Sequence, residues 1–277
     1  MGLCYHETMV IPTKKLKNGF ELPVYGLGLW YMGGTWQTDA SQDMREIEAI
    51  QRAIEAGITH IDTAERYGAG HAEELLHTAT KGYDRKKLLI ATKVSGEHQR
   101  YEDVKRACEA RLKRLGTDYI DLYLLHSYPD PGISVADTMR AMDELIEEGM
   151  VNNIGACNLT VERFKEAQSF SKHKLVCNQV QYNLKYREAE DKKILDYCQD
   201  NDVFLTAWRP LERGLIPQSG LVDELAKKYG RTPNQIAINW LISQDYVVTI
   251  SKTSNPAHLE ENLGAVGWNL DPGDIER

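Results

Sequence analysis

A group of residues in the first half of the chain could together move a proton to or from a carbonyl oxygen. They are Asp62, Tyr67, Lys93 and His126. A tyrosine has an unperturbed pKa of about 10, and a nearby ammonium group favours the phenolate and lowers that pKa. A carboxylate can hold such a lysine in place, and a histidine can orient a carbonyl group or share its proton. This combination predicts a tyrosine that acts as a general acid, poised between phenol and phenolate near neutral pH.

Each of these side chains also has an ordinary structural interpretation. Asp62 could cap a helix or pair with an arginine, and Lys93 could be a solvated surface charge. His126 and Tyr67 could simply be packed core residues. Taken singly, each residue fits the structural interpretation better. Their joint position, at the ends of successive apolar runs, favours the functional one.

These apolar runs have the composition of buried strands. They are ITHID, LLIATK, YIDLYLLH, NNIGACN, VCNQVQ, VFLTAW and VVTISK. Each is followed by or ends in a polar or aromatic residue, namely Asp62, Lys93, His126, Asn158, Gln179, Trp208 and Lys252. In a parallel α/β barrel the carboxyl ends of the strands meet at one mouth, which is where such barrels carry out chemistry. We therefore expect these side chains to converge.

The spacing of apolar residues, glycines and prolines predicts where the elements lie. Predicted strands include 25–29, 58–62, 88–92, 119–125 and 247–251, and predicted helices include 44–55, 72–80, 102–115, 135–148 and one opened by Asn255-Pro256. Eight strand–helix units can be counted along 277 residues, and no linker or change in charge divides the chain. We predict α/β architecture, an eight-stranded parallel (β/α)8 TIM barrel that forms a single domain over residues 1–277, since such barrels need about 250 residues.

A β-hairpin is predicted ahead of the first barrel strand. Asn18-Gly19 lies between the runs MVIPTKKL and FELPVYGLGLW, and this turn between apolar runs is typical of hairpins. We expect the hairpin to close the bottom of the barrel. Gly26-Leu27-Gly28 lies inside the next predicted strand, and no GxGxxG follows a strand. A nucleotide would therefore have to be held without a Rossmann turn.

Composition narrows the possible partners and compartment. The net charge of −8 disfavours non-specific binding to nucleic acid or acidic membranes. No apolar run reaches the length of about 18 residues typical of a membrane span, and the segment MGLCYHETMVIPTKK does not resemble a secretory signal. The five cysteines are scattered and form no CxxC pair, which indicates free thiols and a cytoplasmic location.

A metal-dependent barrel enzyme is an alternative interpretation of the strand ends. His60, Asp62 and His126 could supply the three protein ligands of a catalytic zinc site. Residues 60 and 62 would share one face of their strand, but the chain has no HxH pair and its cysteines are dispersed. We therefore predict that the site binds no metal.

The motifs that carry the chemistry resemble those of the aldo-keto reductase family over essentially the whole chain. GITHIDTAERYG resembles the family segment with the catalytic Asp and Tyr, IATKV the segment with the catalytic Lys, and DYIDLYLLHSYPD the segment that ends in the catalytic His. NIGACN, NQVQYN, AWRPL and ISKTSNPAHLEENLGA resemble the cofactor-holding segments. The family fold is an eight-stranded α/β barrel that uses a nicotinamide cofactor without a Rossmann domain, in agreement with the strand count and the missing GxGxxG.

The resemblance implies a catalytic role for each matching residue. Tyr67 would donate the proton, and Lys93, paired with Asp62, would tune it. His126 would orient the substrate carbonyl, and it favours C=O over C=C reduction because the family's C=C reducers carry Glu there. From residue type and position rather than from the resemblance, we also expect Trp30 to contact the substrate, although aromatic residues in barrel loops are often plain packing. An aromatic stripe of Trp30, Tyr31, Trp36 and Tyr128 could line an apolar substrate pocket.

The resemblance also implies a set of cofactor-binding residues. Asn158 and Gln179 would hydrogen-bond the nicotinamide carboxamide, and Trp208 would stack on the ring. Lys252 and Thr253 would contact the phosphate on the adenosine ribose. The full implied set is Asn158, Gln179, Trp208, Arg209, Leu211, Lys252, Thr253, His258, Glu261 and Asn262.

Several positions depart from the family pattern. His258 replaces the usual Arg, and a neutral imidazole is a poorer phosphate partner than a guanidinium. Arg209 stands where many members have Ser, and its charge could meet the pyrophosphate. Cys157 stands where Ser is common, which removes a hydroxyl donor. The chain stops soon after WNLDPGDIER, so we expect the long C-terminal loop of many members to be short or missing.

These observations predict a cytoplasmic oxidoreductase that reduces aldehydes or ketones to alcohols with NADPH. NADH is expected as a second hydride donor because of His258. The expected partner is a small carbonyl substrate. The glycine-rich segment ERYGAGHAEELL resembles the branch that includes bacterial general reductases and potassium-channel β subunits. An NADPH-binding regulatory subunit of that type is therefore the alternative, and turnover of a simple aldehyde distinguishes the two.

Overall fold

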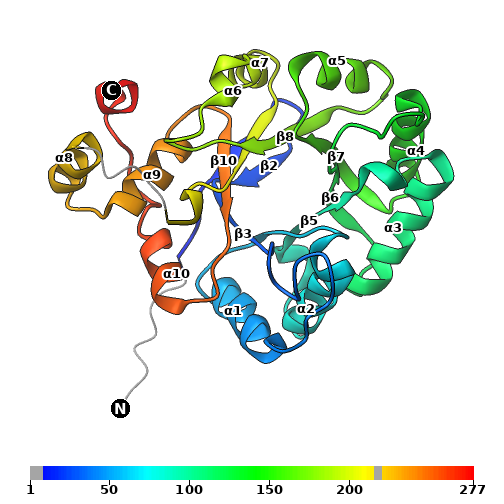
Figure 1. The fold of residues 1–277 in the computed structure, drawn as a ribbon, viewed down its shortest axis with the longest axis horizontal. Coiled ribbons are helices and arrows are strands. Elements are labelled where there is room, and N and C mark those ends of the chain that lie inside the picture. The colour runs from blue at the N-terminus through cyan, green and yellow to red at the C-terminus, as the bar shows by residue number, and fades with distance from the viewer. Residues whose placement is uncertain (1–8, 215–219) are drawn as a thin grey trace.

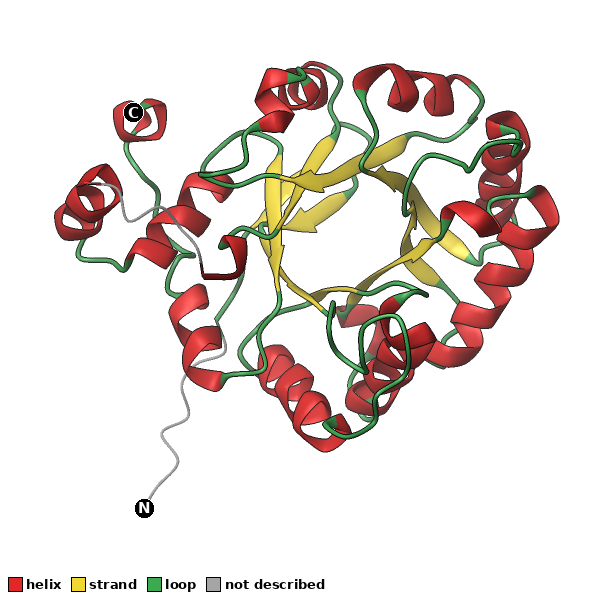
Figure 2. Ribbon diagram, in the orientation of Figure 1, coloured by secondary structure: helices red, strands yellow, loops and turns green. Residues whose placement is uncertain are grey.

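The computed structural model describes residues 9–214 and 220–277. Parallel strands form a closed barrel in the order β10-β3-β4-β5-β6-β7-β8-β9. Helices surround this barrel, as Figures 1 and 2 show. The predicted eight-stranded (β/α)8 barrel is therefore confirmed. The predictions about Cys4 and the start of the N-terminal segment lie outside the described residues.

Each barrel strand pairs with its neighbour in parallel, and β10 closes the ring by pairing with both β9 and β3. The barrel strands are β3 (Tyr25–Gly28), β4 (His60–Asp62), β5 (Leu89–Val94), β6 (Ile120–Leu125), β7 (Val151–Cys157), β8 (Leu175–Gln181), β9 (Phe204–Trp208) and β10 (Val247–Ser251). The predicted strand over 247–251 agrees in both bounds, whereas 58–62 is shortened to its last three residues.

The helices occupy the connections between strands and the end of the chain. They are α1 (Asp43–Glu55), α2 (His71–Thr80), α3 (Tyr101–Leu115), α4 (Val135–Glu147), α5 (Val161–Ser169), α6 (Glu188–Asp191), α7 (Ile194–Asp200), α8 (Gly220–Tyr229), α9 (Pro233–Ile242), α10 (Pro256–Leu263) and α11 (Pro272–Glu276). Short 3₁₀ turns are η1 (Tyr67–Gly70), η2 (Arg85–Lys87), η3 (Gly96–His98) and η4 (Glu212–Gly214). The predicted helix ends agree with these bounds to within one residue.

Local sequence signals explain where the helices begin and end. Helix α3 ends at Gly116, whose φ of 62° is left-handed and favours glycine. Thr232 caps α9 in a capping box with Gln235, and Pro233 occupies the first turn. The side chain of Asn255 likewise caps α10 by accepting the N–H of Ala257.

The hairpin closes the bottom of the barrel, as predicted. Strands β1 (Thr13–Lys15) and β2 (Glu21–Pro23) pair antiparallel. Leu16 and Leu22 are buried in an apolar cluster with Phe204 and Val248, which lie at the beginning of strands β9 and β10. Lys14 fixes the hairpin from one side, because its Nζ donates to the carbonyls of residues 242, 244 and 247 at 2.8, 2.5 and 2.7 Å.

With the bottom closed, the opposite end of the barrel is left for chemistry. The main apolar core lies between the strands and the surrounding helices, and the smaller one fills the lower interior of the barrel. The polar residues at the carboxyl ends of the strands therefore point into the mouth rather than into packed core. No helix in the described part of the chain is long and apolar enough to cross a membrane.

Candidate active site

A cavity of about 850 Å³ opens at the barrel mouth. It runs from the loops after β3 and β4 to the loop between β10 and α10. Its lining residues include, of those predicted from sequence, Trp30, Asp62, Tyr67, His126, Asn158, Gln179, Trp208, Arg209, Leu211, Lys252, Thr253, His258, Glu261 and Asn262. The remaining predicted residue, Lys93, lies beneath the cavity in contact with Tyr67. The structure thus brings the whole predicted set together.

Asp62, Lys93 and Tyr67 form a buried hydrogen-bonded group. The side chains of Asp62 and Lys93 are each 1% exposed, and Lys93 Nζ donates to Asp62 Oδ1 at 2.5 Å. The same ammonium donates to the Thr63 carbonyl at 2.8 Å and lies 3.3 Å from Tyr67 Oη. Neighbouring strands β4 and β5 position the ion pair, and η1 carries the tyrosine. A phenolate formed at Tyr67 would therefore lie directly beside a fixed positive charge.

Burial is the dominant influence on the acidity of Tyr67. It raises the pKa of Tyr67 to about 12, although Lys93 acts in the opposite direction. The prediction of a phenol poised near neutral pH is therefore wrong, because desolvation outweighs the ammonium. Burial lowers the pKa of Lys93, but Asp62 and then Tyr67 more than offset this and hold it above its ordinary value. Tyr67 is consequently a protonated phenol, and Lys93 a permanent cation, at physiological pH.

His126 is a neutral imidazole beside the tyrosine. Burial, followed by the charges of Lys93 and Arg66, lowers the pKa of His126 to about 3. Its ring meets the Tyr67 ring edge-on, with centroids 6.0 Å apart. Among the residues that the structure describes, none forms a hydrogen bond with His126 Nδ1. A neutral histidine can donate one hydrogen bond to a carbonyl oxygen without transferring its own proton.

Two amides and an indole surround the centre of the mouth. Gln179 Nε2 donates to Asp62 Oδ2 at 2.8 Å, which leaves the Gln179 amide tied to the catalytic group. Asn158 has a φ of 60°, a left-handed conformation that brings its Nδ2 to the His126 carbonyl at 3.2 Å. Trp208 Nε1 donates to Asn158 Oδ1 at 3.2 Å. These contacts fix the orientation of Asn158 and Trp208 at the ends of β7 and β9.

The far end of the cavity is lined by β10 and α10. Asn262 is 3% exposed and donates to Ser251 Oγ at 3.3 Å, and its Oδ1 accepts no hydrogen bond from residues 9–214 or 220–277. Glu261 accepts from Asn234 Nδ2 at 3.2 Å. Lys252 is exposed, and its Nζ donates to Ser254 Oγ at 3.4 Å. This end therefore offers unused polar groups, one of them a cation.

Arg209 and Leu211 lie between the two ends. Arg209 has a left-handed φ of 56°, and its guanidinium lies 5.0 Å from the centre of the Trp208 ring. Leu211 contributes the apolar part of this wall. Left-handed conformations of non-glycine residues cost energy and cluster at functional sites, as they do at Asn158 and Arg209.

An aromatic wall forms the side of the mouth next to Tyr67. Trp30 contacts Tyr31, Trp36 and Tyr67 edge-on, with ring centroids 5.0, 5.0 and 4.8 Å apart. The predicted aromatic stripe is therefore right for its first three members and wrong for Tyr128. That residue lies off the cavity, and its hydroxyl donates to Glu166 at 2.5 Å.

Two arginines of the cavity were not predicted. Arg66 and Arg213 both line it, and Arg213 Nη2 lies 3.3 Å from Tyr31 Oη on the opposite wall. The sequence held a signal for Arg66, because it immediately precedes Tyr67 in the motif that carries the catalytic tyrosine. Arg213 had no comparable signal, since it lies in a loop outside any predicted strand end.

Below the catalytic group lies His60, which was weighed as a metal ligand. It is 1% exposed, neither ring nitrogen has a partner within the described part of the chain, and burial lowers its pKa to about 4. Gly26 leaves room for this ring, because a Cβ at Gly26 would lie 2.7 Å from His60 Nδ1. Among residues 9–214 and 220–277, no three His, Cys, Asp or Glu side chains are grouped so that they could hold a metal ion.

Fold and site together define the class of this protein as a (β/α)8 barrel whose mouth carries a Tyr–Lys–Asp–His group and a long adjoining cavity. The chain belongs to the aldo/keto reductase family, since the model of that family matches residues 25–277. Among curated relatives, methylglyoxal reductase YeaE of Escherichia coli is 34% identical over 261 residues, covering 92% of this chain and 89% of that protein. Glyoxal reductase of Bacillus subtilis is 31% identical over 272 residues, covering 98% and 92%.

Solved structures agree with this assignment. A thermostable aldo-keto reductase crystallised with the inhibitor epalrestat is 41% identical, with a TM-score of 0.93 over 96% of this chain and 97% of that one. An aldo-keto reductase of Klebsiella pneumoniae, crystallised with NADPH, is 33% identical, with a TM-score of 0.85 over 97% and 94% of the two chains.

Proposed function

We propose that this protein reduces an aldehyde or ketone to the alcohol, with NADPH as the hydride donor and Tyr67 as the proton donor. The observation that carries the proposal is the buried group at the barrel mouth, in which Lys93 Nζ lies 3.3 Å from Tyr67 Oη and 2.5 Å from Asp62 Oδ1. A phenol that faces a substrate cavity on one side and an ammonium on the other is suited to give up a proton. The membership in the aldo/keto reductase family supports the same reaction.

The cavity fits a dinucleotide along its length. The amides of Asn158 and Gln179 and the half-buried face of Trp208 would hold the nicotinamide at the catalytic end. Lys252 and Thr253 would bind the ribose phosphate at the other end, and so make NADPH the preferred cofactor. The solved Klebsiella pneumoniae relative was crystallised with NADPH. Bound there, the cofactor supplies the hydride.

Beyond these anchors, the remaining predicted residues complete the cofactor site. Arg209 would meet the pyrophosphate and Leu211 would pack beside it. Glu261 and Asn262 would contact the adenine, and the partnerless Oδ1 of Asn262 suits an amino-group donor. His258 is exposed, and its imidazole would contribute less to phosphate binding than the planar guanidinium of an arginine does. NADH is therefore proposed as a weaker second donor.

The protein's own residues perform the proton step. His126, neutral because its pKa is lowered, would donate a hydrogen bond that orients the substrate carbonyl oxygen toward Tyr67. Tyr67 would then give its proton to that oxygen as negative charge develops on it. Lys93 would stabilise the phenolate that remains, and Asp62 would keep Lys93 charged and in place. These residues supply the polarisation, so we propose that the reaction needs no metal ion.

The relatives and the pocket indicate small carbonyl substrates. The named relatives act on methylglyoxal and glyoxal. Trp30 and Tyr31 provide an aromatic wall beside the proposed position of the carbonyl. A regulatory NADPH-binding subunit would use the same cavity for the cofactor. Such a subunit would not need a protonated tyrosine and a neutral histidine that face an open substrate cavity. The presence of both therefore favours an enzyme that turns over substrate. A cytosolic location is proposed because the described cysteines are free thiols.

Loss of NADPH absorbance in the presence of a carbonyl compound tests the proposal. We expect NADPH-dependent turnover of methylglyoxal, of simple aromatic aldehydes, or of both. NADPH should bind to the purified protein and quench its tryptophan fluorescence, because Trp208 lies beside the proposed nicotinamide position. Binding of NADPH without turnover across a panel of aldehydes, ketones and keto-sugars would instead support the regulatory subunit.

A further inference from the structure

Arg66 is a cation at the rim of the barrel mouth that the proposed reaction does not use. Its exposed side chain lines the cavity beside Tyr67, Trp30 and Trp36. It immediately precedes Tyr67 in the chain, and both residues line the same cavity. The guanidinium of Arg66 therefore lies on the side of the mouth where the substrate carbonyl would bind.

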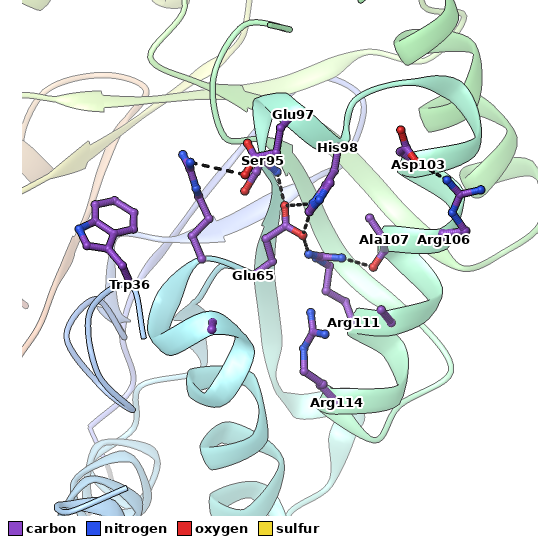
Figure 3. Close-up of a pocket in the computed structure, with 13 residues that line it drawn as sticks. Trp36, Glu65, Ser95, Glu97, His98, Asp103, Arg106, Ala107, Arg111 and Arg114 are labelled. Carbon is purple, nitrogen blue, oxygen red and sulfur yellow. Dashed lines mark hydrogen bonds and ion pairs between the residues drawn. The ribbon is translucent and has the colours of Figure 1, made fainter. Parts of the chain in front are cut away.

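Arg66 also lines a cavity next to the mouth. A second cavity of about 760 Å³ lies on the flank of the barrel, between the loops after β4 and β5 and helix α3 (Figure 3). Figure 3 shows Trp36 at one end of it and Asp103 and Arg106, from α3, at the other. Trp36 and Arg66 line both cavities and so form their shared wall. A group that leaves the mouth along this wall must pass Arg66.

Four arginines line the flank cavity, and two of them are tied to buried carboxylates of the fold. These two are Arg111 and Arg114, and the others are Arg66 and Arg106. Arg111 pairs with Glu65, and both side chains are less than 10% exposed. Arg114 Nε donates to fully buried Glu73 at 2.6 Å. Arg106 pairs with Asp103 on its own helix. Replacing these partners with a ligand would leave a carboxylate uncompensated or break a local pair.

Arg66 differs from Arg111 and Arg114 because its partner is exposed and exchangeable. The pair of Arg106 is also exposed, but of these four arginines it is Arg66 that also lines the mouth cavity. Its Nη2 lies 3.4 Å from Glu97 Oε1, and the two side chains are 46% and 44% exposed. Exposed ion pairs of this kind contribute little, because water screens them. The Arg66 guanidinium also lies 5.5 Å from the centre of the Trp36 ring. This cation–π contact can keep the guanidinium at the shared wall when another carboxylate replaces that of Glu97.

No carboxylate in the mouth competes for an anion at Arg66. Of the acidic residues in the described ranges, Asp62 and Glu261 line the mouth cavity. Asp62 is 1% exposed and neutralised by Lys93. Glu261 belongs to α10, at the end of the cavity assigned to adenine. The substrate side of the mouth therefore presents aromatic rings and two guanidinium groups. Arg66 lies at the wall shared with the flank cavity, and Arg213 lies across from it, with Nη2 3.3 Å from Tyr31 Oη.

We propose that Arg66 binds a carboxylate of the substrate, and that the preferred substrates are aldehydes or ketones that carry such an anionic group. This inference rests on the proposed carbonyl reduction and names its substrate class. Arg66 would exchange the Glu97 carboxylate for that of the substrate, and a planar guanidinium binds a carboxylate through two parallel hydrogen bonds. The aromatic wall would hold the apolar part of the substrate between the carboxylate and the reacting carbonyl.

A matched pair of substrates tests the proposal. The compounds are 4-carboxybenzaldehyde and 4-carbamoylbenzaldehyde, which have nearly the same shape and differ in charge. We expect the wild-type protein to prefer the acid in kcat/KM by at least about tenfold, the range for a hydrogen-bonded charged group. Arg66→Gln should bring the ratio of the two kcat/KM values close to one, mainly through KM for the acid.

Two further variants separate a direct role of Arg66 from a structural one. Glu97→Gln removes the competing carboxylate, so it should increase the preference for the acid. Arg106→Gln removes a positive charge from the flank cavity away from the mouth, so the ratio should stay at its wild-type value. The proposal is overturned if Arg66→Gln leaves the ratio unchanged, or if Arg106→Gln lowers it as much as Arg66→Gln does.

A binding experiment keeps the proposal testable without turnover. Benzoate and benzamide are titrated into the protein with NADPH present, and tryptophan fluorescence is followed. We expect benzoate to bind the wild-type protein at least about tenfold more tightly than benzamide does. Arg66→Gln should bind the two compounds with equal affinity. This result without any aldehyde reduction would uphold the carboxylate site and overturn carbonyl reduction. Equal binding of both compounds to the wild type would overturn the carboxylate site alone.

Discussion

The ion pair between Asp62 and Lys93 makes a prediction whose size follows from its burial. Both side chains are 1% exposed, so removing one partner leaves the other charge in a poorly solvated place. Breaking such a pair costs about 3–5 kcal/mol, whereas removing both partners costs much less. We therefore expect Lys93→Met to lower the free energy of unfolding by about 3–5 kcal/mol.

The two single variants should differ, because their remaining hydrogen bonds differ. After Lys93→Met, the Asp62 carboxylate keeps one donor, Gln179 Nε2 at 2.8 Å. After Asp62→Asn, the ammonium keeps the Thr63 carbonyl at 2.8 Å, and the amide oxygen of Asn replaces the carboxylate oxygen as a neutral acceptor. Asp62→Asn should therefore destabilise the protein less than Lys93→Met. The double variant should regain at least about 2 kcal/mol relative to the sum of the two singles.

Urea unfolding of the four proteins at one pH measures this cycle, and turnover measures the function separately. Lys93→Met and the double variant should both be inactive, because Tyr67 loses the ammonium beside its hydroxyl in each. Recovery of stability without recovery of activity is the signature of a pair kept for catalysis. A loss of less than about 1 kcal/mol for Lys93→Met, or additive losses in the double variant, would refute the reasoning from burial.

Two further predictions concern cofactor choice and acid stability. Lys252→Met should weaken NADPH binding at least about tenfold and leave NADH binding nearly unchanged, and His258→Arg should widen the preference for NADPH. Fluorescence titration measures both. If Lys252→Met weakened the binding of both cofactors equally, Lys252 would not bind the ribose phosphate. His60 has a pKa lowered to about 4, so the unfolded chain binds its proton first as the pH falls below 6.5. The free energy of unfolding should then drop by about 2 kcal/mol between pH 7 and pH 5 on account of His60. In urea unfolding, His60→Asn should make the free energy of unfolding depend less steeply on pH. If that pH dependence were the same in the variant as in the wild type, His60 would not be a buried neutral imidazole.

The positions of the site residues could be predicted from sequence because the barrel converts order along the chain into proximity. Asp62, Lys93 and His126 lie at successive strand ends, and parallel strands bring such ends to one mouth. The apolar runs mark the strands, and local signals such as Gly116 at the end of α3 mark the helices. Neither signal depends on tertiary contacts.

The properties that depend on depth and on loops could not be predicted in this way. The pKa of Tyr67 is raised because the ring is 8% exposed, and the motif reports the neighbouring ammonium but not that burial. Arg66 and Trp36 form a shared wall through loop conformations that the periodicity of strands and helices does not encode. Tyr128 was misplaced for the same reason, since its position depends on the loop after β6.

The most direct test of the account is the role of Tyr67 as proton donor, measured by single-turnover oxidation of NADPH with a reactive aromatic aldehyde. Tyr67→Phe keeps the ring that packs against Trp30 and removes the hydroxyl beside Lys93. The account predicts that this variant binds NADPH with nearly wild-type affinity and loses at least about a hundredfold in the rate of the chemical step. A Phe variant whose single-turnover rate stays near that of the wild type, with chemistry shown to limit that rate, would contradict it.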